Sequence, residues 1–120
     1  MKYPSDMDPE CVRLCDAINS IPGLSTGSSC CGHGKGAFRV YFRVEDLTYL
    51  PILLYYMDPC HVGFRWDCLV RTDCSMAPVG FHVESRSMGA DAYREADIIA
   101  GKISSDLEKH IKHVKAEAGQ

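Results

Sequence analysis

The sequence predicts an α+β fold: a single domain in the order αββαββα, with a mainly antiparallel four-stranded sheet and its helices packed on one face. Stretches in which apolar and polar residues alternate, typical of half-buried strands, are separated by stretches with apolar residues every three or four positions, typical of amphipathic helices. A chain of 120 residues suits one hydrophobic core. We therefore expect one domain over residues 1–120, ordered over about residues 8–114, with flexible termini.

The first helix is expected over residues 8–21. Asp8 is a suitable N-cap, Pro9 suits the first helical position, and a Pro-Gly dipeptide follows the last turn. A short strand rich in serine and threonine follows over residues 24–30. The first hairpin of the fold is completed by residues 38–44, where Phe and Val alternate with Arg and Tyr.

A second helix is expected to begin after Thr48 as N-cap, with Pro51 in its first turn, and to run to about Met57. The second hairpin is expected over residues 62–71 and 79–86, because both stretches alternate between apolar and polar residues.

The closing helix is expected over residues 90–114, and its apolar stripe is longer than the sheet beneath it. The stripe spans roughly 34 Å, whereas five- to seven-residue strands support only about 17–23 Å. Some of Leu107, Ile111 and Val114 should then overhang the core, and two interpretations stay open: a homodimer through this helix, or a helix that frays after Lys109.

If the helices cover one face of the sheet, the other face is open and rich in arginine. Two interpretations of this face remain open: a solvated surface with ion pairs across the strands, or guanidinium groups that hold an anionic ligand. The residues expected on it are Arg39, Arg43, Arg65, Arg71 and Arg86, with Tyr41, Asp67, His82 and Glu84.

The glycine-rich loop of residues 28–36 gathers the densest group of reactive side chains. Glycines let a backbone approach a ligand and turn successive N–H groups toward it. We therefore expect a small or nucleotide-like anionic ligand at this loop, assisted by arginines of the open face. The expected ligand-binding residues are Ser28, Ser29, Cys30, Gly32, His33, Gly34, Lys35, Arg39, Arg65, His82, Glu84 and Arg86.

The same loop carries candidate catalytic and metal-binding residues. Cys30 or Cys31 would act as nucleophile in a thiol enzyme, with His33 as candidate base and His61 or His82 as alternatives, if the two groups lie within hydrogen-bond reach. Cys31, His33 and His61 are the candidate metal ligands, since zinc prefers thiolate and imidazole. Their spacing matches no zinc finger, and free buried thiols are the alternative, so no metal site is assigned.

Charge and composition exclude several functional classes. The net charge of -3 argues against indiscriminate nucleic-acid binding, although a local basic patch, and with it RNA, stays open. No apolar run approaches the roughly 18 residues of a membrane span, and the first residues carry no signal-peptide core, so we expect a cytoplasmic protein without membrane contact. The seven cysteines are then expected to be reduced, and Cys30 and Cys31 to react first.

Two stretches resemble a known family and together cover about a third of the chain. The helix and strand that end in Leu24-Ser25-Thr26-Gly27-Ser28-Ser29-Cys30, followed by Gly32, resemble the opening of the wybutosine-synthesising tRNA methyltransferase family. The stretch Phe81-His82-Val83-Glu84-Ser85-Arg86 and the helix after it are similar to a later strand and helix of that family. The loop sequence Ser-Cys-Cys-Gly-His-Gly also resembles that of small bacterial or phage proteins, which implies no activity.

The family resemblance implies a sheet domain that transfers a methyl group from S-adenosylmethionine to a modified guanosine of tRNA. It places Ser28, Ser29, Cys30, His82 and Arg86 near the site. Three function classes therefore remain open: a module that binds an anionic ligand, an enzyme that is related to this family or depends on a thiol, and a dimeric interaction module.

Overall fold

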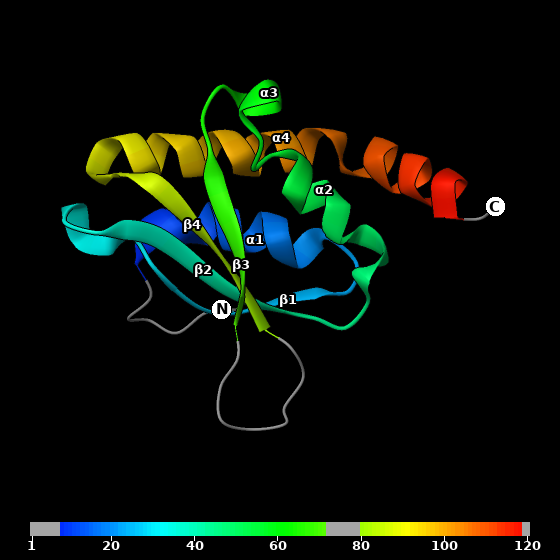
Figure 1. Cartoon of the computed structure of the whole chain (residues 1–120), viewed down its shortest axis with the longest axis horizontal. Coiled ribbons are helices and arrows are strands. Elements are labelled where there is room, and N and C mark those ends of the chain that lie inside the picture. Colours follow the sequence, from blue (N-terminus) through cyan, green and yellow to red (C-terminus); the bar gives the residue numbers. More distant parts are fainter. Residues whose placement is uncertain (1–7, 72–79, 119–120) are drawn as a thin grey trace.

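The computed structural model describes residues 8–71 and 80–118 and shows a four-stranded sheet with helices on one face (Figure 1). The predicted α+β class and its alternation of helices with hairpins are confirmed. The strands are β1 (Leu24–Cys30), β2 (Ala37–Val44), β3 (Trp66–Arg71) and β4 (Gly80–Met88). The helices are α1 (Val12–Ser20), α2 (Leu50–Tyr55), α3 (Pro59–Val62) and α4 (Gly89–Ala118), and the 3-10 turns are η1 (Pro9–Cys11), η2 (Gly32–Gly34) and η3 (Leu47–Tyr49).

The sheet joins the two hairpins through their second strands, in the order β1-β2-β4-β3, and all neighbouring strands are antiparallel. Val83 of β4 lies opposite Val40 of β2 and opposite Cys68 of β3. Because side chains alternate across a strand, these apolar residues share one face of the sheet and the arginines share the other. The register thus confirms the separation of faces that the alternating sequence predicts.

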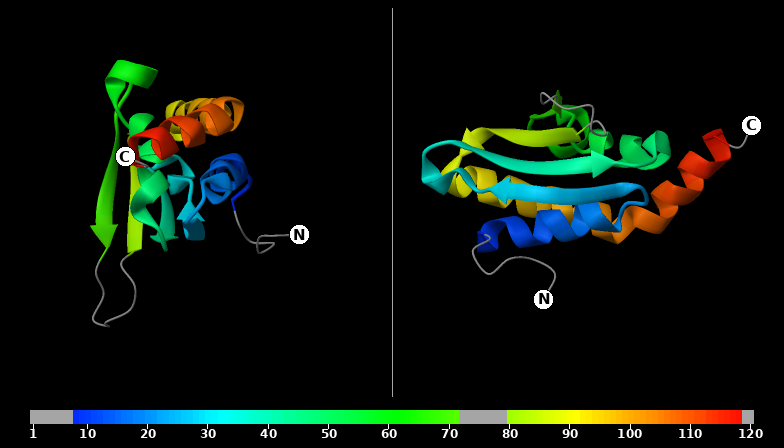
Figure 2. Two further views of the ribbon diagram at one scale, coloured as in Figure 1. Left: turned by 90° about the vertical axis from the view of Figure 1, so that its right-hand side faces the viewer. Right: turned by 90° about the horizontal axis from the view of Figure 1, so that it is seen from below.

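Helices α1 and α4 lie against the apolar face, and Figure 2 shows both on the same side of the sheet. Leu14, Cys15 and Ile18 form the buried stripe of α1. The far end of β3 is not covered in this way, since Val70 on the same face is 62% exposed. We call the opposite surface, which carries the arginines of β2, β3 and β4, the open face.

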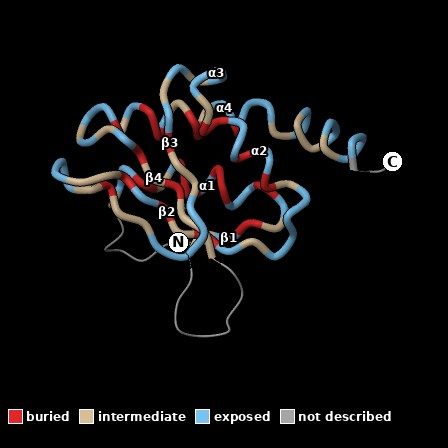
Figure 3. Tube along the Cα trace, in the orientation of Figure 1, coloured by how far each residue is buried: buried red, intermediate tan, exposed pale blue. Residues whose placement is uncertain are grey.

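The core lies between the sheet and these two helices (Figure 3). Phe38 and Trp66 are fully buried there, with ring centroids 5.4 Å apart. The carboxylate of Glu95 on α4 is also buried, and it accepts hydrogen bonds from Nε1 of Trp66 at 2.9 Å and from the hydroxyl of Ser87 at 2.8 Å. This polar group therefore ties α4 to both β3 and β4.

The strand β3 begins at Trp66, so the prediction of a strand from Val62 is wrong. The preceding residues form α3 instead. The Asp58 carboxylate caps the start of this helix by accepting a hydrogen bond from the Cys60 amide, and Pro59 occupies the first turn of the helix. Gly63, with φ 85°, then ends the helix in a left-handed conformation. The extended backbone predicted here does not form, because a capped turn of helix satisfies these backbone groups locally.

The second predicted helix is also capped differently from the expectation. Asp46 caps η3, and its carboxylate accepts from the amide of Thr48 at 2.9 Å and from its hydroxyl at 2.6 Å. Thr48 is therefore the donor rather than the N-cap. Pro51 does lie in the first turn of α2, as predicted, and α2 ends at Tyr55.

The last helix runs to Ala118, beyond the predicted end at Val114. Leu107, Ile111 and Val114 are half-buried and pack against the core cluster. A hydrogen bond between the Tyr56 hydroxyl and Nε2 of His110 fastens the end of α2 to α4. The predicted overhang is thus partly covered within the chain, and the homodimer stays a prediction.

None of the described helices combines the length and the apolar character that a bilayer span needs. Val79, which begins the last predicted strand, and residues 72–78 before it, with Cys74, lie outside the described residues.

Candidate functional site

The chain passes from β1 to β2 through three consecutive residues with left-handed backbone angles: Gly32 with φ 82°, His33 with φ 52° and Gly34 with φ 78°. Only glycine fits at position 32, because a Cβ there would lie 2.8 Å from the carbonyl oxygen of Ala37. A left-handed histidine costs conformational energy and is uncommon. This turn brings the His33 ring back toward the side chain of Cys31.

Four side chains meet at this turn, and we call them the loop cluster: Asp8, Cys31, His33 and Tyr93. The Sγ atom of Cys31 lies 3.8 Å from Nδ1 of His33, and Nε2 of His33 lies 3.9 Å from Oδ2 of Asp8. The Tyr93 hydroxyl donates to the same sulfur at 3.7 Å. Residues from the N-terminus, the glycine loop and α4 therefore converge at one point.

Asp8 makes a different contact from the one that its sequence position predicts. It occupies the N-cap position before Pro9, yet its side chain makes no cap hydrogen bond. Its Oδ2 instead accepts from the amide of Cys31 at 2.9 Å, and this hydrogen bond lowers the pKa of the carboxyl group. The carboxylate that the sequence assigns to a helix end thus belongs to the loop cluster.

The amides of the glycine loop are occupied by partners within the protein. Besides the hydrogen bond to Asp8, the sulfur of each cysteine accepts a hydrogen bond from the amide two residues later, Cys30 from Gly32 and Cys31 from His33. The carbonyl oxygen of Gly32 accepts two further hydrogen bonds, from backbone amides later in the loop. The loop therefore does not present the free row of N–H groups expected for an anion. The amides concerned are those of Cys31, Gly32, His33, Lys35 and Gly36.

Burial disfavours the thiolate that a cysteine nucleophile requires. Cys31 is 3% exposed, and desolvation raises the pKa of its thiol. Desolvation also raises the pKa of Cys11 to about 12 and that of Cys68 to about 11. The raised pKa of the Cys31 thiol near His33 favours its protonated form, which argues against its action as a free nucleophile.

Thiol labelling tests this arrangement. Among the cysteines that the structure describes, Cys60 is exposed and Cys30 is half-buried, so maleimide should modify Cys60 before Cys30, in place of the order expected from the sequence, in which Cys30 and Cys31 react first. The buried Cys31 should react at least about ten times more slowly than Cys60, because little thiolate is present and access is poor. Peptide mass spectrometry over a time course measures the order, and denatured protein is the control. Equal rates for Cys31 and Cys60 in the native chain would contradict the burial of Cys31.

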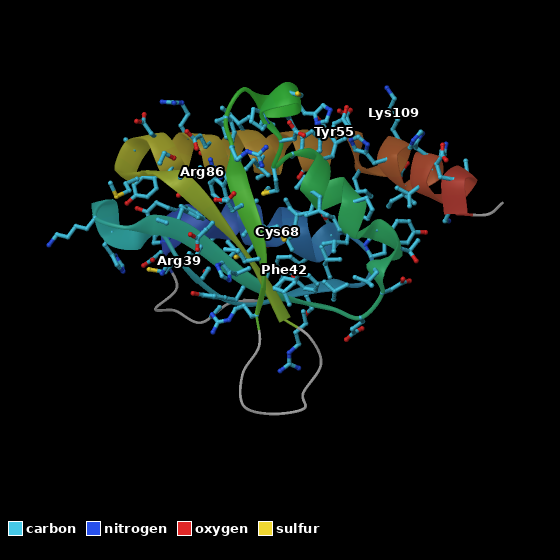
Figure 4. The ribbon with its side chains drawn as sticks, in the orientation of Figure 1. Arg39, Phe42, Tyr55, Cys68, Arg86 and Lys109 are labelled. Atoms are coloured by element: carbon cyan, nitrogen blue, oxygen red, sulfur yellow. The ribbon has the colours of Figure 1, made fainter. Side chains whose placement is uncertain are left out.

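At the end of the open face that carries Arg39 and Arg86, the charged side chains form ion pairs. Arg86 donates from Nε and Nη2 to the two carboxylate oxygens of Asp67, each at 3.0 Å, and this pairing lowers the pKa of Asp67. Glu84 accepts from Nε of Arg39 at 3.2 Å and contacts Nε2 of His82 at 2.9 Å. Figure 4 shows Arg39 on β2 and Arg86 on β4. The interpretation as a solvated, ion-paired face is correct for these two arginines.

Two further arginines lie at the other end of the open face, on either side of a residue without a side chain. Gly80 of β4 pairs with Arg43 of β2 and with Arg71 of β3. The guanidinium carbon of Arg71 lies 4.4 Å from the ring centroid of Tyr41. Within residues 8–71 and 80–118, neither arginine forms an ion pair. We call Tyr41, Arg43, Arg71 and Gly80 the arginine pair site.

The remaining predicted site residues do not join either group. Ser29 lies opposite Val40 on the apolar face, where its hydroxyl interacts with the thiols of Cys11 and Cys15. Ser28, Gly34 and Lys35 are exposed in or beside the loop. Arg65 precedes β3, and His61 stacks on Tyr55 with ring centroids 3.6 Å apart. The expected single site is therefore divided among several places in the fold.

Sequence reasoning left several residues of these two groups out of its expected sites. Arg43, Arg71 and Tyr41 were placed on the correct face, but only the strand register shows that both arginines flank Gly80. Asp8 and Tyr93 lie far along the chain from Cys31, and no local pattern indicates that they approach it.

Comparison of the chain with protein-family models, with curated proteins and with solved structures gives no match. The resemblance to the wybutosine-synthesising family therefore stays a prediction from the residues quoted above.

Proposed function

We propose that the open face binds a small, nucleotide-like anionic ligand at the arginine pair site. The observation that carries the proposal is the placement of Arg43 and Arg71 on either side of Gly80, without an ion pair among the described residues. The chain as a whole carries a net charge of -3, so this local excess of positive charge is not a general property of its surface. Guanidinium groups attract anions.

The spacing of the two arginines suits one phosphate group. Neighbouring strands lie about 4.8 Å apart, so residues on the two strands that flank β4 have backbones roughly 10 Å apart. Their long side chains then reach an oxygen anion above Gly80 from both sides. A Cβ at Gly80 would make only ordinary contacts, at 3.8 Å and beyond, so the space above this strand is not filled by the backbone. Bidentate hydrogen bonds from guanidinium groups would give such a site both electrostatic attraction and a preferred orientation of the phosphate.

The aromatic side chain beside the arginines suits the base of a nucleotide. Tyr41 is half-buried, with the Arg71 guanidinium over its ring and the His82 ring 5.2 Å away. A planar base stacks on such a surface, and stacking is worth about 1–3 kcal/mol per base. The combination of a half-buried aromatic ring with arginines favours a nucleotide over a simple carboxylate.

The proposal is one of binding rather than of catalysis. Among the residues that the resemblance implies for methyl transfer, Ser29 lies on the apolar face, whereas His82 and Arg86 lie on the open face. The sheet therefore separates these groups. The glycine loop contributes less to ligand binding than the sequence predicts, because its amides already donate hydrogen bonds within the protein. We therefore place the proposed ligand on the sheet rather than at the loop.

Titration of the full chain with AMP, GMP and inorganic phosphate tests this function, and the chemical shifts of the backbone amides, measured by NMR, report the binding. We expect shifts at Tyr41, Arg71 and Gly80, with the nucleotides binding more tightly than phosphate. Arg43→Ala and Arg71→Ala should each weaken binding about ten-fold or more, since a hydrogen bond to a charged group contributes about 1.5–3 kcal/mol. Tyr41→Leu should weaken nucleotide binding while inorganic phosphate binding changes little.

The matched control is Arg94→Ala, which removes an arginine from an exposed ion pair with Asp91 on α4. It should leave the affinity unchanged within two-fold. Absence of shifts on the open face with all three probes, or an equal loss in Arg94→Ala and Arg71→Ala, would contradict the proposal.

A further inference from the structure

We propose that Asp8, Cys31 and His33 bind a divalent transition-metal ion of the zinc class. These residues offer a carboxylate oxygen, a sulfur and a ring nitrogen whose candidate ligand atoms all lie within 4.8 Å of one another. Oxygen, sulfur and nitrogen donors in one cluster are the ligand types that zinc takes in proteins. The cluster contains two of the three residues considered from the sequence, and Asp8 takes the place of His61.

The distance between two of the donors, the Cys31 sulfur and a His33 ring nitrogen, is close to that of a coordinated site. Zinc bonds of about 2.0–2.3 Å in a tetrahedral arrangement place neighbouring ligand atoms about 3.3–3.6 Å apart. The sulfur of Cys31 lies 3.8 Å from Nδ1 of His33, a distance only slightly longer than such an edge. A rotation of the exposed His33 side chain would bring one ring nitrogen to the ion, and the half-buried Asp8 carboxylate, held at the Cys31 amide, would supply one oxygen, because each residue needs to supply a single atom.

The surrounding structure holds these ligands in place. The left-handed turn at Gly32 and His33 directs the imidazole toward Cys31, and glycine is required at position 32 for this turn. The amide of Cys31 fixes Asp8 through the 2.9 Å hydrogen bond to its carboxylate. The Tyr93 hydroxyl donates to the sulfur, which is a favourable outer contact for a metal-bound thiolate. An uncommon left-handed backbone conformation at His33 thus helps to bring these donors together.

The site would keep one coordination position for a water molecule. Three protein ligands leave a tetrahedral ion with one open position. The side chain of His33 is 69% exposed and that of Asp8 is 21% exposed, so this position faces solvent. Coordination replaces the proton on the Cys31 sulfur with the metal, and that proton passes to the solvent.

Metal titration of the full chain, stripped with a chelator and kept reduced, tests this inference. Calorimetry with Zn²⁺ should show one ion bound per chain, and Co²⁺ should give a near-ultraviolet band from cysteine thiolate to metal. Asp8→Asn and His33→Ala should each weaken binding at least about ten-fold. Cys31→Ser should abolish the thiolate band.

Cys60 and His61 provide the matched control, because they are an exposed cysteine and histidine on α3 outside the loop cluster. The variants Cys60→Ser and His61→Ala should keep the wild-type affinity and the cobalt band. Circular dichroism of each metal-free variant checks its fold, and the solvent-facing His33→Ala remains informative if Cys31→Ser does not fold. No zinc binding to the wild type, a thiolate band retained in Cys31→Ser, or loss of binding in Cys60→Ser would overturn the inference.

Discussion

Replacing Phe38 with alanine is expected to lower the free energy of unfolding by about 3–5 kcal/mol. Phe38 is fully buried at the centre of the apolar face, where its ring lies 5.4 Å from that of Trp66 and 6.3 Å from that of Tyr93. Its removal leaves a cavity between β2, β3 and α4, and the surrounding elements are too firmly paired to close it. Denaturant unfolding, followed by far-ultraviolet circular dichroism, measures the change.

Phe64→Ala is the matched control for this substitution. Phe64 is a half-buried residue outside the strands, so the same truncation there should cost clearly less than at Phe38. Arg43→Ala on the open face should cost under about 1 kcal/mol. Equal losses at Phe38 and Phe64 would mean that the core is centred elsewhere.

The second large effect is expected at Glu95, where Glu95→Ala should lower the free energy of unfolding by about 2–4 kcal/mol. The substitution leaves the indole N–H of Trp66 and the hydroxyl of Ser87 without their acceptor. Each buried donor without a partner costs about 1–3 kcal/mol, and the shortened side chain also leaves unfilled space. Thermal and denaturant unfolding measure the loss.

Glu95→Gln separates the role of the acceptor from that of the charge. Its side-chain carbonyl oxygen can still accept from Trp66, so this variant should lose clearly less stability than Glu95→Ala. A double-mutant cycle with Trp66→Phe should give a coupling energy of about 0.5–3 kcal/mol, because the two residues share a buried hydrogen bond. A coupling of zero would contradict a direct role of Glu95 in holding Trp66.

The assignment of residues to the two faces of the sheet was predictable, because strand periodicity is a local property of the sequence. Phe38, Val40 and Phe42 alternate with Arg39 and Tyr41, and this alternation alone places the two sets on opposite faces. The long stripe of α4 was predictable for the same reason, since it repeats over many turns. The start of β3 was not, because the capping of α3 by Asp58 competes with an alternating pattern that extends to Val62.

The candidate sites were less predictable than the fold. The glycine loop was identified from its composition, yet the loop supplies only Cys31 and His33 to the loop cluster. Asp8 appeared to be an ordinary N-cap, and its interaction with the Cys31 amide depends on how η1 meets the end of β1. Likewise, which arginines pair with carboxylates depends on strand register, which places Arg86 beside Asp67 but Arg43 beside Gly80.

The amino-acid sequence alone predicted the α+β class, the separation of an apolar face from a face rich in arginine, and the position of the glycine loop. These features follow from residue periodicity and from glycine content, which act over a few neighbouring residues. The tertiary structure decided that Asp8 meets Cys31 and His33 and that Arg43 and Arg71 flank Gly80. Contacts of this kind join residues distant in the chain, and they are set by strand order, register and helix packing rather than by local preference.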